Sequence, residues 1–225
     1  MYYDLGNLKI FVEDSYEEMS KKGAEVIAAQ VVEKTDSVIG LATGSTPVGM
    51  YKELARKHKE ETLDFSCTTT FNLDEYYPIK RANDQSYYYF MYDNLFNHIN
   101  VPSDKINLPN GEAADIEEEC ASYEKKIKAA GGIDLQLLGI GNNGHIGFNE
   151  PDGFFEKDTH VVNLQQNTIE ANSRFFDSVD DVPKQAVTMG IKTIMSAKKI
   201  LMLVNGEKKA DIVKAFFPLS AVSLI

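Results

Sequence analysis

The chain has 225 residues, of which 43% are hydrophobic and 25% are charged, so it is long enough for one large domain and is neither collagen-like, low in complexity nor wholly disordered. Its 34 acidic side chains outnumber its 23 Lys and Arg side chains, and the net charge of -11 argues against a nucleic-acid-binding protein, because neutralising phosphates requires clustered cations. The two cysteines have no C-x-x-C partner, so we expect reduced thiols. The N-terminus lacks the pattern of a secretory signal and the apolar runs are only strand-sized, so we expect a cytoplasmic protein without a membrane span.

The hydrophobic pattern alternates between short apolar runs, typical of strands, and longer segments of helical period. Ser15-x-x-Glu18 has the spacing of a capping box at the start of a helix. Pro47 suits the first position of a second helix, and Gly131-Gly132 would end a later one. In chain order the pattern predicts a strand at residues 8–12, a helix from 16, a strand at 38–42, a helix from 47 to about 59, a strand at 67–71, helices at 88–99 and 116–127, strands at 133–140 and 200–204, a helix at about 208–217 and a closing strand at 221–225.

Strands that are separated by helices imply right-handed crossovers. We therefore expect one α/β domain over residues 1–225, with a mainly parallel open sheet and helices on both of its faces. In such sheets ligands bind beyond the carboxyl ends of the strands. Functional residues should accordingly follow the strand runs, and four clusters of unusual residues do so.

The first cluster, Thr43-Gly44-Ser45-Thr46, lies between a predicted strand and the helix at Pro47. A glycine turn, consecutive amides and a helix N-terminus together form an anion cradle, most often for phosphate. The spacing of a nucleotide P-loop is missing, so ATP is not implied. The same residues could equally serve as an N-cap for the first helical turn.

Asp74 and Glu75 form the second cluster, directly after the predicted strand at residues 67–71. Adjacent acids at the end of a strand point in different directions, so one can face a pocket while the other caps a helix or pairs with a cation. A solvated turn is the alternative interpretation.

The third cluster is the segment 138–151, in which Gly139-x-Gly141-x-x-Gly144 superficially matches the dinucleotide-binding fingerprint. That fingerprint needs a helix at its third glycine, and Gly147 and Pro151 follow too soon for one. We therefore predict a glycine-braced loop and no dinucleotide site.

This loop presents Asn143, His145, Asn149 and Glu150. Histidine titrates nearest to neutrality, and a nearby carboxylate can orient it and raise its basicity. The spacing is not that of a metal-binding motif and no third ligand is evident, so we expect no metal. Many histidines are structural, but a polar, glycine-rich loop after a strand favours a functional one.

Lys208 and Lys209 form the fourth cluster, at the start of the helix predicted from about residue 208. Cations at a helix N-terminus oppose the helix dipole, so a bound anion would offset the conflict. Two solvated lysines are the more frequent outcome. Arg174 is a further candidate anion ligand.

Together these segments resemble the glucosamine-6-phosphate deaminase (isomerase) family, within the wider group that includes 6-phosphogluconolactonases. Asp74-Glu75-Tyr76 favours the deaminases, because the lactonases usually carry an acid-acid-Arg pattern there. The resemblance implies a modified Rossmann-like fold, no organic cofactor, and conversion of glucosamine 6-phosphate and water to fructose 6-phosphate and ammonia. The matching segments, in family order across nearly the whole chain, are 40–47, 71–76, 139–151, 171–177 and 206–210.

The residue-by-residue match also implies roles for the singled-out side chains. His145 would open the sugar ring, with Asn143 and Glu150 as its neighbours. Asp74 would carry a proton from C2 to C1 of the open sugar. The residues matched to the phosphate site are Thr43, Gly44, Ser45, Thr46, Arg174 and Lys209.

The chain departs from the family pattern at a few places. Many members carry Asp where this chain has Asn143, and an amide should orient its neighbours rather than exchange protons. Residues 152–156 and the short stretch 217–225 do not match features of the longer, allosteric hexamers, so we expect no amino-sugar effector site and a monomer or small homo-oligomer. Residues from about 158 to 184 correspond to the mobile lid of the family.

Two other functions compete with the deaminase. A hydrolase of a phosphorylated sugar lactone is the nearest rival. A non-catalytic sugar-phosphate sensor would keep the anion cradle and lose the proton-transfer groups, yet Asp74, His145 and Glu150 are all present. Galactosamine 6-phosphate differs from glucosamine 6-phosphate only at C4, and nothing in the sequence excludes it as a substrate.

Overall fold

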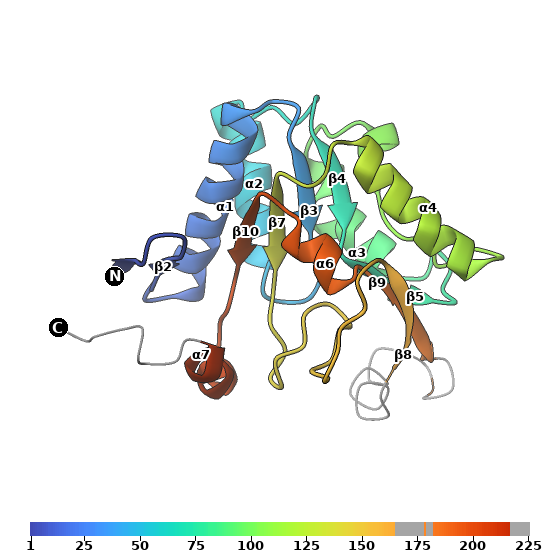
Figure 1. Ribbon diagram of the computed structural model, residues 1–225. Helices are drawn as coiled ribbons and strands as arrows, with labels where there is room; N and C mark the ends of the chain where they lie inside the picture. The colour runs from blue at the N-terminus through green and yellow to red at the C-terminus, as the bar shows by residue number, and fades with distance from the viewer. Residues whose placement is uncertain (165–177, 179–181, 217–225) are drawn as a thin grey trace.

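Five parallel strands form the central sheet of the computed structural model, which describes residues 1–164, 178 and 182–216 (Figure 1). The strand order is β10-β7-β3-β4-β6. β3 and β7 are buried along their full lengths, as expected for strands that are covered on both faces. The predicted parallel sheet is thereby confirmed. Its strands are β3 (Val38–Leu41), β4 (Thr69–Asn72), β6 (Ile106–Asn107), β7 (Leu135–Leu138) and β10 (Lys199–Met202).

Helices cover both faces of this sheet, with α1 and α2 on one side and α4 on the other (Figure 1). Tyr123 of α4 packs edge-on against Phe71 of β4, with ring centroids 5.7 Å apart. Gly23 lets α1 approach α2, since a Cβ there would lie 3.0 Å from Sδ of Met50. No helix within the described ranges is long and apolar enough to cross a membrane. The helices are α1 (Tyr16–Glu33), α2 (Val48–Glu61), α3 (Tyr87–Asn94), α4 (Ile116–Ala129), α6 (Ile191–Met195) and α7 (Ala210–Phe216), and the 3-10 turns are η1 (Phe96–His98), η2 (Ser103–Lys105) and η5 (Glu207–Lys209).

The helix boundaries follow the capping signals closely. The Ser15 hydroxyl accepts the Glu18 amide at 3.1 Å, and Glu18 in return accepts the amide of Asp14, one residue earlier than in an ideal capping box. At the C-terminus of α4, the Gly132 amide donates to the carbonyl of Ile127 at 3.0 Å. Gly132 has φ +82°, a left-handed conformation that glycine adopts without strain.

A second, antiparallel sheet has the order β5-β9-β8 and was not predicted. Only Leu73 separates β5 from β4, so the chain leaves the parallel sheet and enters this one almost at once. The strands are short, and β5 reads Asp-Glu-Tyr-Tyr, which gives no apolar alternation. Their extended conformation therefore depends on the pairing itself. The strands are β5 (Asp74–Tyr77), β8 (His160–Asn163) and β9 (Gln185–Thr188).

Some predicted segments differ in extent or partner. The strand expected at residues 8–12 exists as β2 (Lys9–Phe11), but it forms a separate antiparallel hairpin with β1 (Tyr2–Asp4). The helix expected over 88–99 ends at Asn94, because Leu95 leaves helical geometry and a 3-10 turn follows. The closing strand predicted at 221–225 lies outside the described residues.

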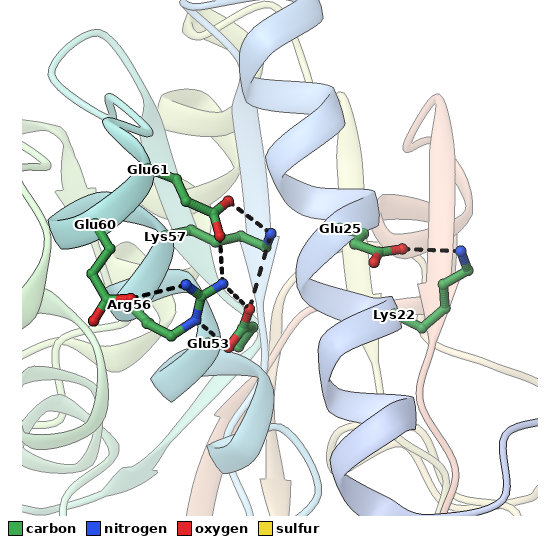
Figure 2. A network of polar contacts seen from close by, with 7 residues as sticks. All are labelled: Lys22, Glu25, Glu53, Arg56, Lys57, Glu60 and Glu61. Atoms are coloured by element: carbon green, nitrogen blue, oxygen red, sulfur yellow. Dashed lines mark hydrogen bonds and ion pairs between the residues drawn. The ribbon is translucent and has the colours of Figure 1, made fainter.

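Ion pairs cover the solvent side of α2, the helix whose N-terminus follows the first cluster (Figure 2). Arg56 contacts Glu53 at 2.6 Å, Glu60 at 3.0 Å and Glu61 at 2.5 Å, and Lys57 contacts Glu61 at 3.1 Å. Each such surface pair contributes a few tenths of a kcal/mol. The network therefore supports α2 but does not determine its position.

Candidate active site

Asp74 is a buried carboxyl group at the start of β5, with only 6% of the residue exposed. Its Oδ1 has no hydrogen-bond partner among the described residues. Burial, with a smaller contribution from the charge of Glu75, raises the pKa of Asp74 to about 8. A carboxyl group in this environment can hold or release a proton near neutral pH.

Glu75 is oriented differently and caps a helix, one of the two roles expected for the second cluster. Its carboxylate accepts the amides of Tyr87 and Tyr88 in the first turn of α3, both at 2.8 Å, and that of Tyr76 at 2.9 Å. A negative charge is stabilised at a helix N-terminus. Burial raises the pKa of Glu75 to about 7 even though these amides lower it. The neighbouring acids therefore occupy unlike environments.

The segment 139–151 is a loop held by its own backbone, as predicted. The Gly141 amide donates to the carbonyl of His145 at 2.8 Å, and Ile146 and Asn149 form an isolated antiparallel bridge. No helix opens at Gly144, which confirms that the glycine spacing is not a dinucleotide fingerprint.

His145 lies against the backbone of Gly141 so closely that a Cβ on Gly141 would be 2.3 Å from ring atoms Cε1 and Nδ1. Its Nδ1 is 3.9 Å from Oε2 of Glu150 and has no hydrogen bond among the described residues. Asn143 links the two: its Nδ2 donates to Glu150 at 2.6 Å, and its Oδ1 accepts the His145 amide at 3.2 Å. Burial lowers the pKa of His145, and the Glu150 charge opposes this only in part, so the imidazole is neutral at pH 7.

Gly147 brings Asp74 and this loop together. A Cβ on Gly147 would lie 3.3 Å from Oδ2 of Asp74 and 2.7 Å from Oγ1 of Thr188. Thr188 is the cross-strand partner of Asp74, and its Oγ1 accepts the amide of Phe148 at 3.2 Å. The Asp74 carboxylate therefore lies against the loop two residues beyond His145.

The loop 43–46 is tied to two other parts of the chain. The Tyr16 hydroxyl donates to the carbonyl of Ser45 at 3.0 Å and accepts the amide of Gly49 at 2.8 Å. The Thr46 hydroxyl donates to Asn205, just beyond β10, at 2.7 Å. Gly44 has φ +97°, and a Cβ on it would meet open space.

Lys209 lies beside the same edge of the sheet, where its Nζ donates to the carbonyl of Ile140, just after β7, at 2.6 Å. Burial lowers the pKa of Lys209, whereas its neighbour Lys208 is exposed. The loops after β3, β7 and β10 thus converge at the carboxyl edge of the sheet (Figure 1), as expected for an α/β sheet. Arg174 lies outside the described residues.

Several residues that shape this site were missed by the sequence analysis. Asn205 carried a usable signal, because it directly follows the predicted strand at 200–204. Thr188 and Tyr16 carried none, since their hydroxyls act on segments 40 and 29 residues away. The lid is predicted at about residues 158–184. Its described part includes β8 and the residues that directly precede β9. Residues 165–177 and 179–181 lie outside the described ranges.

A family model described as glucosamine-6-phosphate isomerases/6-phosphogluconolactonase matches residues 12–223 of the chain. The chain belongs to this family. Two family members named glucosamine-6-phosphate deaminase, from Clostridium botulinum strain Langeland and Clostridioides difficile strain 630, are each 60% identical to it over 206 residues, which cover 92% of this chain and 84% and 83% of theirs.

Solved structures of the wider family have the same fold. A structure of a monomeric glucosamine-6-phosphate deaminase of the NagB superfamily superposes with a TM-score of 0.86 and 47% identity, over 93% of this chain and 90% of the other. The 6-phosphogluconolactonase of Thermotoga maritima superposes with a TM-score of 0.70 at 21% identity, over the same shares of the two chains, and supports the fold alone. The modified Rossmann-like architecture expected from the resemblance is therefore confirmed.

Proposed function

We propose that this chain converts glucosamine 6-phosphate and water to fructose 6-phosphate and ammonia. The observation that carries the proposal is the buried Asp74 carboxyl group, whose Oδ2 lies against the glycine-rich loop of His145 and whose Oδ1 has no hydrogen-bond partner in the described part of the chain. The similarity to the two clostridial deaminases supports this activity over that of a lactonase. A sugar-phosphate sensor would need no such proton-transfer groups.

His145 opens the sugar ring in this scheme. A neutral imidazole accepts the proton of the anomeric hydroxyl and delivers a proton to the ring oxygen, whose bond to C1 breaks. Glu150, 3.9 Å from Nδ1, orients the ring and stabilises its transient positive charge. Asn143 holds Glu150 through an amide donor and exchanges no proton itself.

Asp74 performs the isomerisation. Its carboxylate takes the C2 proton of the open aldehyde while the substrate ammonium gives a proton to O1, which leaves an enolamine. Asp74 then returns its proton to C1 to give a protonated ketimine. Water then adds to C2 and ammonia leaves, which yields the ketose. The protons and the water balance without net oxidation, so the sequence of steps requires no redox cofactor.

The phosphate occupies the cradle at the carboxyl edge of the sheet. Amides and hydroxyls of Thr43, Gly44, Ser45 and Thr46 surround it, and the Lys209 ammonium, with its pKa lowered by burial, supplies a nearby cation. Arg174 is proposed as a further ligand from the family match. Binding energy from this non-reacting end positions C1 and C2 at the catalytic groups.

We also propose a cytoplasmic monomer or small homo-oligomer that binds neither nucleic acid nor a membrane, with residues from about 158 to 184 as the lid.

The decisive experiment is to incubate the protein with glucosamine 6-phosphate and to measure the ammonia released. Asp74→Asn should lower turnover at least about a hundredfold while phosphate-dependent affinity is kept, because only the proton-transfer group is lost. Asp93→Asn, a change of an exposed acid on α3, is the matched control. Lactone hydrolysis without ammonia release would favour the rival function, and galactosamine 6-phosphate in a parallel arm resolves the C4 preference.

His145→Gln separates the two chemical stages. It should slow the reaction of the cyclic sugar more than that of an open-chain analogue, because only the cyclic form requires ring opening. Equal losses with both substrates would remove His145 from that role.

A further inference from the structure

Thr188 occupies the junction between the two groups that the proposed reaction requires. It is the last residue of β9, the central strand of the antiparallel sheet, and it is fully buried. Its cross-strand partner on one side is Asp74. On the other side its partner is His160 of β8.

The hydroxyl group of Thr188 faces the glycine-rich loop. Its Oγ1 accepts the Phe148 amide at 3.2 Å, and the Gly147 backbone passes so close that a Cβ there would lie 2.7 Å from the same oxygen. One side chain thus contacts the backbone of the His145 loop while its own backbone pairs with the strand of Asp74.

The loop is held by such external contacts as well as by its own backbone hydrogen bonds. Gly144 and Gly147 both have positive φ, and glycine costs more conformational entropy to order than any other residue. A second contact joins Nδ2 of Asn149 to the Met189 carbonyl at 2.8 Å, but any residue at position 189 would supply that carbonyl. Of these two contacts, only the one made by the Thr188 hydroxyl depends on residue type.

We propose that Thr188 is a positioning residue that sets the placement of the His145 loop relative to Asp74. This proposal rests on the proposed function. Asp74 must reach C2 and His145 must reach the ring oxygen and anomeric hydroxyl of one anchored ligand. A displacement of about 1 Å at such a site can cost about a hundredfold in rate.

Thr188→Val is the direct test, because valine keeps the shape and removes the acceptor. It should lower kcat about tenfold or more and leave KM for glucosamine 6-phosphate nearly unchanged, since the phosphate cradle lies on other loops. Thr188→Ser keeps the hydroxyl and should restore most of kcat. If the valine variant does not fold, Thr188→Ala takes its place in the test, because alanine also lacks the acceptor and should show the same loss of kcat.

Thr193→Val is the matched control. Thr193 is also buried, and its hydroxyl donates to Glu124 at 2.7 Å, outside the site described above. Its replacement should leave kcat unchanged, whatever its effect on melting temperature. Wild-type kcat in the Thr188→Val and Thr188→Ala variants, or an equal loss in Thr188→Ser and Thr188→Val, would overturn the proposal.

Amide hydrogen exchange provides a measurement that does not require activity. In Thr188→Val the Phe148 amide should exchange faster than in the wild type, whereas in Thr188→Ser it should stay protected. Unchanged protection in the valine variant would overturn the positioning role. Absence of ammonia release by the wild-type protein, with the expected exchange pattern intact, would instead refute the proposed function.

Discussion

The ionisation of Asp74 should control how the proposed deaminase responds to pH. The proton at C2 can be taken only by the carboxylate, and burial raises the pKa of Asp74 to about 8. With that pKa, about one tenth of the free enzyme carries the charged base at pH 7 and about one hundredth at pH 6. We therefore expect kcat/KM to rise about tenfold per pH unit up to about pH 8 and then to level off.

His145 does not add a second rise to this profile. Its pKa lies below the ordinary histidine value because of burial, so it is already neutral where Asp74 titrates. Glu75→Gln provides a variant in which the pKa of Asp74 should fall. Loss of the negative charge beside Asp74 should lower the pKa of Asp74 and move the rise in kcat/KM to lower pH.

The assay is ammonia release from pH 6 to about 9.5 at constant ionic strength, with kcat/KM determined at each pH. The amine and phosphate of the substrate are titrated separately by NMR, so that their ionisation can be divided out. Asp93→Asn should reproduce the wild-type profile. A corrected profile that is flat between pH 6 and 9 would refute the assignment of Asp74 as a base with a raised pKa.

Two further predictions concern residues outside the proton-transfer pair. Burial alone would raise the pKa of Asp134, but hydrogen bonds from two lysines and a backbone amide outweigh it and lower the pKa from 3.8 to about 2. Asp134→Asn should therefore reduce the free energy of unfolding by about 2 kcal/mol at pH 7, measured by urea denaturation. This difference should persist above the unfolded pKa of 3.8 and vanish as the pH falls through about 2, and equal stability at pH 7 would contradict it. Gly141→Ala would place a methyl group 2.3 Å from the His145 ring, so kcat should fall about tenfold or more; Gly139→Ala, where a Cβ meets nothing within 4 Å, should retain activity.

Much of this architecture follows from local rules. Ser15 and Gly132 mark helix ends because a hydroxyl and a left-handed glycine satisfy terminal backbone groups wherever the helix lies. The parallel strands β3 and β7 are buried on both faces, so their apolar runs could be recognised from the sequence without tertiary information. Gly147 and Pro151 forbid a helix after β7 for reasons confined to their own backbones, which is why the glycine-rich segment could be predicted as a loop.

The antiparallel sheet, by contrast, could not be predicted from the sequence. β5 and β9 are separated by more than a hundred residues, and strands of four residues without apolar alternation carry no periodic signal. The roles of the adjacent acids were equally undecided, because both are exposed to solvent in an extended chain. The amides of Tyr87 and Tyr88 reach the Glu75 carboxylate only when α3 packs beside β5.

Residue types and their order therefore sufficed to indicate a parallel α/β sheet, an acid after one strand and a histidine loop after another. The tertiary structure added the features on which the chemistry depends. These are the desolvation that raises the pKa of Asp74, the close packing of His145 against Gly141 and the contact of Thr188 with the loop. These properties arise from burial and close approach between distant segments. They come into being only when those segments pack together.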